Sequence, residues 1–217
     1  MEIKGLEIKR LGHDTFKIKS EEITVYTDPF KLEGRTDLEK ADLILVSHEH
    51  FDHCDSDSIK VLSKESTELV GSKGAIEKLG KGKALLPGQE TEVKGIKIKA
   101  VKAYNINKFR SPGVPFHPPE SDMLGFVFIL DSIKLYHAGD TDNIPEMKEL
   151  ADESIDIAML PISGTYVMNE EEAVEAIKVI KPKIVVPMHY GTLKGLDINP
   201  EKFKEMVRDL AEVRIVE

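Results

Sequence analysis

Three histidines and an aspartate crowd into six residues directly after a strongly apolar segment of this chain. Residues 41–46 are almost continuously apolar, which predicts a β-strand buried on both faces. Ser47 follows, and then His48-Glu49-His50-Phe51-Asp52-His53. Four such side chains at the end of a buried strand would be costly to leave unpaired. The fold must therefore have a central strand that delivers polar groups to a shared site.

The spacing of these side chains favours metal binding. His48 and His50 are two residues apart, so an extended backbone points both imidazoles to one side, and Asp52 follows in the same phase. His53 then turns to a neighbouring direction. Imidazole nitrogens and carboxylate oxygens suit zinc or a related divalent ion, and a second ion nearby is geometrically compatible.

Length and composition indicate one α/β domain over residues 1–217, with 41% hydrophobic and 32% charged residues. The net charge of −9 disfavours general nucleic-acid binding. No apolar run approaches the roughly 18 residues of a membrane helix, and no signal peptide is visible. With the single cysteine Cys54, these features predict a cytoplasmic protein. A homo-oligomer is left open.

Hydrophobic periodicity and turn residues predict the secondary structure. Residues 6–11, 15–20 and 23–27 favour an antiparallel meander, and a second β-rich block covers 92–104, 124–130 and 134–137. The last third alternates strands (155–160, 183–187, 213–216) with helices (170–180, 200–210). Helices are also expected at 56–64 and 73–79. The proline-rich segment 105–122 is either a pocket-lining lid or a mobile surface loop.

Two further motifs follow predicted strands. One is Tyr136-His137-Ala138-Gly139-Asp140-Thr141, and the other is Pro187-Met188-His189-Tyr190-Gly191. If the strands before them run in the same direction, their ends bring these groups to the histidine motif, where α/β proteins usually carry their active sites.

In this order, the motifs resemble the metallo-β-lactamase superfamily. The resemblance covers residues from about Asp28 to Tyr190, and its most specific part is the His-x-His-x-Asp-His of residues 48–53. Leu11-Gly12-His13 and Thr27-Asp28-Pro29-Phe30 are similar to the branch with ascorbate-phosphate lactonases and N-acyl phosphatidylethanolamine phosphodiesterases. The resemblance implies a four-layer αβ/βα sandwich.

The resemblance also implies roles for single residues. His48 and His50 would bind one divalent ion, Asp52, His53 and His189 would bind the other, and Asp140 would bridge both. The ions would be Zn²⁺, with Mn²⁺, Fe²⁺ or Ni²⁺ as alternatives. Asp28 would support a ligand histidine through a hydrogen bond. His137 either acts as a similar support or simply ends a strand.

One position departs from the family pattern. The third histidine of the first ion normally follows the strand that here ends at Tyr104, but this chain has Asn105. His117 could fold back to replace it, Asn105 could bind through its oxygen, or the site could be partly open. We favour His117.

These features predict a metal-dependent hydrolase in which a metal-bridged hydroxide attacks a small phosphoester, lactone or related ester. Asp52 and Asp140 would hold and orient the hydroxide. The resemblance implies the activity of a phosphodiesterase or a lactonase. Tyr166 and Tyr190 are candidate substrate-binding phenols. The alternative is a metal-binding sensor or scaffold with little turnover, which the missing histidine at Asn105 supports. Cys54 and His13 are not expected to be catalytic.

Overall fold

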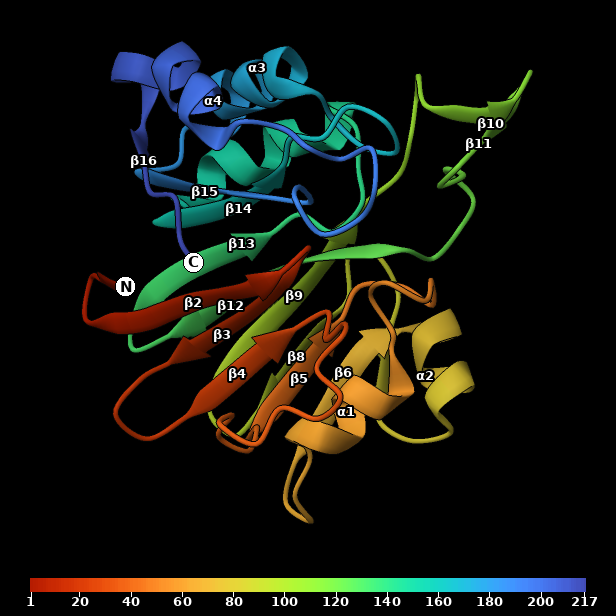
Figure 1. The fold of residues 1–217 in the computed structure, drawn as a ribbon, viewed down its shortest axis with the longest axis vertical. Coiled ribbons are helices and arrows are strands. Elements are labelled where there is room, and N and C mark those ends of the chain that lie inside the picture. Colours follow the sequence, from red (N-terminus) through yellow and green to blue (C-terminus); the bar gives the residue numbers. More distant parts are fainter.

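The computed structural model describes residues 1–217, and two seven-stranded sheets form its centre (Figure 1). The first sheet is built from the N-terminal part of the chain. Its strands lie in sequence order: β1 (Glu2–Ile3), β2 (Leu6–Gly12), β3 (Thr15–Lys19), β4 (Thr24–Thr27), β5 (Leu43–Val46), β6 (Glu68–Ser72) and β7 (Lys83–Leu85). Strands β1 to β4 pair antiparallel, and β4 to β7 pair parallel. The predicted meander is therefore confirmed.

The second sheet is built from the rest of the chain and has the order β16-β15-β14-β13-β12-β9-β8. Its strands are β8 (Glu90–Val93), β9 (Ile96–Lys102), β12 (Leu124–Leu130), β13 (Ile133–His137), β14 (Ile157–Pro161), β15 (Ile184–Met188) and β16 (Glu212–Val213). Strands β13 to β16 are parallel to one another. Parallel pairing brings the carboxyl ends of β13 and β15 to the same edge.

Helices cover the outer faces of both sheets. The helices α1 (Ser56–Leu62) and α2 (Lys73–Leu79) lie on the side of the first sheet, and η1 (Pro145–Glu153), α3 (Glu170–Ile180), α4 (Pro200–Val207) and η2 (Arg208–Leu210) lie on the side of the second (Figure 1). A core of 45 buried residues includes side chains from both sheets, and a second cluster of 10 lies beneath α1 and α2. The arrangement is the four-layer αβ/βα sandwich that the sequence predicts. No helix has both the length and the apolar character needed to cross a membrane.

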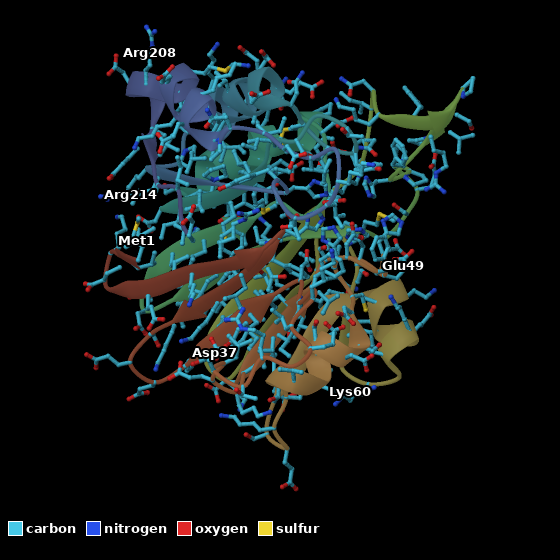
Figure 2. The ribbon with its side chains drawn as sticks, in the orientation of Figure 1. Met1, Asp37, Glu49, Lys60, Arg208 and Arg214 are labelled. Atoms are coloured by element: carbon cyan, nitrogen blue, oxygen red, sulfur yellow. The ribbon has the colours of Figure 1, made fainter.

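The segment 105–122 is not irregular throughout. It contains a small two-stranded hairpin, β10 (Phe109–Ser111) and β11 (Val114–Pro115), that projects from the body of the molecule (Figure 1). Glu49, in the loop after β5, lies on the same side of the molecule as this hairpin, whereas Met1 and Arg214 lie on the opposite side (Figure 2). The carboxyl ends of the parallel strands and the hairpin therefore lie along one edge of the molecule.

Candidate metal centre

The three histidine motifs meet at this edge. The loop after β5 carries His48, His50, Asp52 and His53, the loop after β13 carries Asp140, and His189 directly follows β15. The first loop belongs to one sheet and the other two belong to the second sheet. The candidate ligands are therefore supplied from both halves of the sandwich.

A first group consists of His48, His50 and His117, each of which offers one ligand atom within 4.8 Å of the other two. Nε2 of His48 lies 3.0 Å from Nδ1 of His50. Ligands 2.0–2.1 Å from a tetrahedral zinc ion lie about 3.3 Å from one another, so this spacing fits a shared cation. His48 and His117 are buried, and His50 is half-buried.

A second group surrounds Asp140. Oδ1 of this carboxylate lies 3.3 Å from Nε2 of His53 and 3.3 Å from Nε2 of His189. None of these three atoms has a hydrogen-bond partner, although all are buried. Asp52 joins His53 and His189 within the same 4.8 Å limit. Buried acceptor atoms without donors that converge in this way fit a bound cation.

Asp140 connects the two groups. While its Oδ1 faces His53 and His189, its Oδ2 lies 3.2 Å from Nε2 of His117. The two oxygens of one carboxylate therefore point at different histidine groups. This orientation is the one required of a bridging ligand.

Hydrogen bonds behind the histidines fix their tautomers. Nδ1 of His53 lies 2.8 Å from Oδ2 of Asp28, and Nδ1 of His189 lies 2.8 Å from Oγ of Ser163. The hydroxyl of Ser47 donates to Oδ2 of Asp28 at 2.6 Å, so Oγ of Ser47 can itself accept a hydrogen bond from Nδ1 of His48 at 2.9 Å. Each ring that donates from Nδ1 keeps a free electron pair on Nε2, as a metal ligand requires.

Asn105, the residue that departs from the family pattern, supports His117 through the same kind of hydrogen bond to Nδ1. Oδ1 of Asn105 accepts from the backbone N–H of His117 at 2.9 Å and from its Nδ1 at 2.8 Å. Nδ2 of Asn105 donates to Oδ1 of Asp142 at 3.2 Å and to the carbonyl of Tyr166 at 2.9 Å. Asn105 thus holds His117 with Nε2 directed at the site, and the structure places His117, rather than Asn105, beside His48 and His50.

Burial and charge control protonation in this cluster. Burial, with a smaller contribution from the neighbouring His53, holds the pKa of His48 well below its usual range, and burial and His117 lower the pKa of His50. Burial alone would raise the pKa of Asp140, but His189 and His53 hold it well below its usual range. His48 and His50 therefore present neutral imidazoles, and the Asp140 carboxylate is ionised.

Several site residues have a left-handed backbone. Asp28, His189 and His13 have φ values of +39°, +61° and +48°. Such conformations cost about 1–3 kcal/mol each outside glycine and persist where surrounding contacts impose them. Gly139, next to Asp140, has φ of +61°, and a Cβ there would lie 2.5 Å from the carbonyl oxygen of Leu124. Only glycine fits at this turn.

Three other predicted residues have different surroundings. His137 is buried behind the site, with Nε2 donating to the carbonyl of Asp14 at 3.0 Å and Nδ1 accepting from the N–H of Gly139 at 3.3 Å. The ring of Tyr190 packs beneath the guanidinium of Arg10, at 3.9 Å, and does not line the pocket described below. Cys54 is buried beneath α1 and α2 and belongs to no group of candidate ligands.

A pocket of about 350 Å³ opens beside the two histidine groups. Its polar lining is His50, Asp52, Asp140, His117 and Arg110, and its apolar lining is Phe51, Phe116, Tyr166 and Leu193. The rings of Phe116 and Tyr166 pack edge to face, with centroids 4.8 Å apart. Of the two phenols predicted from the sequence, the structure brings Tyr166 to the pocket.

Sequence reasoning missed several residues of this region. Ser47 and Ser163 contact candidate ligand histidines, but a serine beside a histidine carries no specific signal. The aromatic wall was missed because Phe116 is placed by the conformation of the hairpin segment and Phe51 by that of the histidine loop. His13, at the turn between β2 and β3, lies in a group with Asp52, His53 and His189. The Gly12-His13 motif was its only signal.

Comparisons with known proteins agree with this architecture. The β-lactamase superfamily domain matches residues 7–189. A UPF0173 metal-dependent hydrolase of Thermococcus onnurineus is 33% identical, and the match covers 97% of this chain and 96% of that protein. A crystal structure from Parabacteroides distasonis, provisionally assigned as a metal-dependent hydrolase, has a TM-score of 0.86 and 35% identity over 98% of this chain and 93% of the other.

A metallo hydrolase of Ignicoccus hospitalis superposes with a TM-score of 0.81 at 26% identity, over 98% of this chain and 95% of that one. These matches extend over nearly the whole chain. Their shared description, a metal-dependent hydrolase, agrees with the donor set assembled at the strand ends. The chain therefore belongs to the metallo-β-lactamase superfamily, among its UPF0173 metal-dependent hydrolases.

Proposed function

We propose that this protein is a zinc-dependent hydrolase that cleaves a small phosphoester, lactone or related ester. The observation that carries the proposal is the convergence of histidine Nε2 atoms on both oxygens of Asp140. His48, His50 and His117 would hold one ion, Asp52, His53 and His189 would hold the other, and Asp140 would bind both. Nitrogen-rich sites of this kind favour zinc over magnesium or calcium.

When bound, a pair of such ions supplies a hydroxide nucleophile at neutral pH and polarises the bond to be cleaved. The protein's own contribution is to hold charge and geometry. Burial alone would raise the pKa of Asp52, but contact with His13 and the neighbouring His53 lower it to about 2, so its carboxylate is ionised near neutral pH. Asp52 and Asp140 can therefore orient the nucleophile and accept its hydrogen bond.

The pocket supports a substrate that combines an anionic group with an apolar one. Arg110 lines it and forms no salt bridge; its Nη2 donates only to the carbonyl of Phe116, at 2.8 Å. Lys108, the other cation of the hairpin segment, is already bound to both carboxylate oxygens of Glu172, at 2.9 and 2.7 Å. Arg110 is thus the available anchor for a phosphate or carboxylate.

The alternative of a sensor or scaffold with little turnover rested on an incomplete first site. His117 lies where it can complete that site, and an open pocket adjoins both histidine groups. Catalytic zinc sites keep a position open toward substrate, whereas structural sites are closed by protein ligands. These two observations favour the hydrolase.

The decisive experiment combines metal analysis with a substrate panel. We expect two zinc ions per chain, and hydrolysis of a generic phosphodiester, an aryl ester or a lactone that is lost on chelation and restored by zinc. The variant Asp52→Ala should lose activity by a factor of about 10³ or more, because it removes a residue that acts on the reacting atoms.

The matched control is Asp57→Ala, which removes a surface carboxylate paired with Lys60 on α1. It should hydrolyse the same substrates at the unmodified rate. Full activity of the Asp52→Ala protein, or tight zinc binding with no turnover across the panel, would contradict the proposal.

A further inference from the structure

His13 occupies a strained turn that the rest of the molecule holds in place. It lies between β2 and β3 with φ of +48°, next to an irregularity in their pairing at Arg10 and Gly12. Its backbone N–H donates to Oγ1 of Thr192 at 2.6 Å, and its carbonyl accepts from Nε of Arg10 at 3.0 Å and from the N–H of His189 at 3.3 Å. These bonds fix the direction of the side chain.

The imidazole of His13 is fully buried, and neither ring nitrogen has a hydrogen-bond partner. A buried neutral histidine ordinarily satisfies its donor, because an unpaired polar group costs about 1–3 kcal/mol. His137 is a direct comparison within the same chain: it is equally buried, and both of its nitrogens are paired. His13 therefore has a place for a partner other than a hydrogen-bonded group of the protein, although Oδ2 of Asp52 lies near its Nε2.

That partner position lies at the second histidine group. Nε2 of His13 is 3.3 Å from Oδ2 of Asp52, and its ring centroid lies 4.1 Å from that of His189 and 5.2 Å from that of His53. One ligand atom from each of these four residues falls within 4.8 Å of all the others. His13 closes this group from the first sheet, and His189, which directly follows β15, closes it from the second.

We infer that His13 is a further ligand of the second metal ion and binds it through Nε2. The inference rests on the proposed two-ion site and extends its ligand set. Each ion would then be held by three imidazoles: His48, His50 and His117 for the first, and His13, His53 and His189 for the second. Such a nitrogen-rich second site would favour zinc, nickel or cobalt over manganese.

The test observes the ligand bond directly. The protein is labelled with ¹⁵N at histidine, stripped of metal and loaded with ¹¹³Cd²⁺, and the histidine nitrogens that show one-bond coupling to cadmium are recorded by NMR. We expect a coupled Nε2 resonance that is absent from the His13→Gln variant. The matched variant His137→Gln should keep every coupled resonance of the wild type.

Metal affinity provides a second readout by competition with a chelator. Changes behind a metal ligand cost about 10–100-fold in affinity, so loss of a true ligand should weaken one of the two ions by more than about 100-fold and leave the other unchanged. If His13→Gln fails to fold by circular dichroism, His13→Asn serves instead, and the wild-type spectrum still reports on His13 once its resonances are assigned.

The outcomes separate the two proposals. If cadmium couples to His53 and His189 but not to His13, the inference is overturned and the two-ion site stands. If the wild type binds no cadmium at either group, the proposed function fails as well. A coupled His13 resonance with selective loss of one ion in the variant supports the inference.

Discussion

Asp28 supports both histidine groups from a single position. Its Oδ2 accepts from Nδ1 of His53 directly, and it reaches His48 through the hydroxyl of Ser47. Its Oδ1 accepts from the backbone N–H of Ser47 at 2.7 Å, which anchors the start of the histidine loop. A carboxylate behind a ligand imidazole fixes the tautomer and increases the basicity of the ring. Asp28 thus couples the geometry of the two candidate ion sites.

Arg110 should determine the preference for anionic substrates. Arg110→Gln removes the only lysine or arginine that lines the pocket, a side chain that forms no salt bridge. We expect KM for a phosphorylated or carboxylated ester to rise about tenfold, the size of one partly exposed charge-assisted hydrogen bond, with a smaller change in kcat. Steady-state kinetics on paired anionic and neutral esters measures the difference.

The control for this prediction is Arg35→Gln, which removes a surface arginine paired with Asp37. It should leave KM unchanged for both substrates. An equal loss on the anionic and the neutral ester after Arg110→Gln would show that the arginine supports the hairpin rather than binding an anion.

At the scale of residues, local motifs predicted one part of the site and missed another. His48, His50 and His53 are close in sequence, so strand geometry alone brings them together. His117 depends on how a loop folds back, which left Asn105 as an alternative. His13 depends on contacts such as that of its N–H with Thr192, 179 positions away, and no local pattern records such a contact.

At the scale of elements, prediction succeeded where termini carry explicit signals. The helix 170–180 was predicted with its observed bounds, and Asn169 forms a capping box with Glu172. The strands β6 and β7 were missed because their neighbours in the sheet, rather than alternation of apolar residues, define them. The 3₁₀ helix η1 was missed as well, since its position depends on packing against α3. Tertiary contacts decide such short elements.

Asp156 connects elements of both sheets and should make stability depend on pH. It binds Nζ of Lys4, in the β1–β2 turn, at 3.0 Å, Nζ of Lys183 at 2.9 Å, and the N–H of Lys134 at 3.0 Å. Burial alone would raise the pKa of Asp156, but the Lys134 N–H and the two ammonium groups lower it to about 2. Its ordinary value is 3.8, so the folded protein favours the ionised form.

Because the pKa is lower in the folded state, this stabilisation is nearly complete above about pH 5 and is lost as the pH falls through the folded pKa of about 2. We expect Asp156→Asn to reduce the free energy of unfolding by about 1–2 kcal/mol at pH 7, a value discounted for solvent screening, and by much less at pH 2. Urea titrations at both pH values measure this. The control is Asp209→Asn, which changes an exposed carboxylate. An equal loss of unfolding free energy at both pH values after Asp156→Asn would contradict the role given to the Asp156 charge.

At the scale of the whole molecule, the candidate site joins the two halves of the sandwich. The histidine loop after β5 belongs to the first sheet, and Asp140 and His189 belong to the second. Of the eight buried side-chain atoms without a hydrogen-bond partner, seven belong to this region: His13 Nδ1 and Nε2, Asp14 Oδ1 and Oδ2, His53 Nε2, Asp140 Oδ1 and His189 Nε2. Unpaired polar groups concentrated at one junction make it the part of the fold that a bound cation would stabilise most.

Metal binding should therefore raise the stability of the entire fold. An ion that binds only the folded state, at a hundred times its Kd, adds about 2.7 kcal/mol. For a chain of this size each kcal/mol raises Tm by about 2–4 °C, so each zinc ion should raise Tm by about 5–10 °C. Circular dichroism melts of stripped and zinc-loaded protein measure the change. Magnesium, which prefers oxygen ligands in octahedral geometry, should raise Tm far less. Equal melting temperatures with and without zinc would show that the cluster does not hold the two sheets together through a metal.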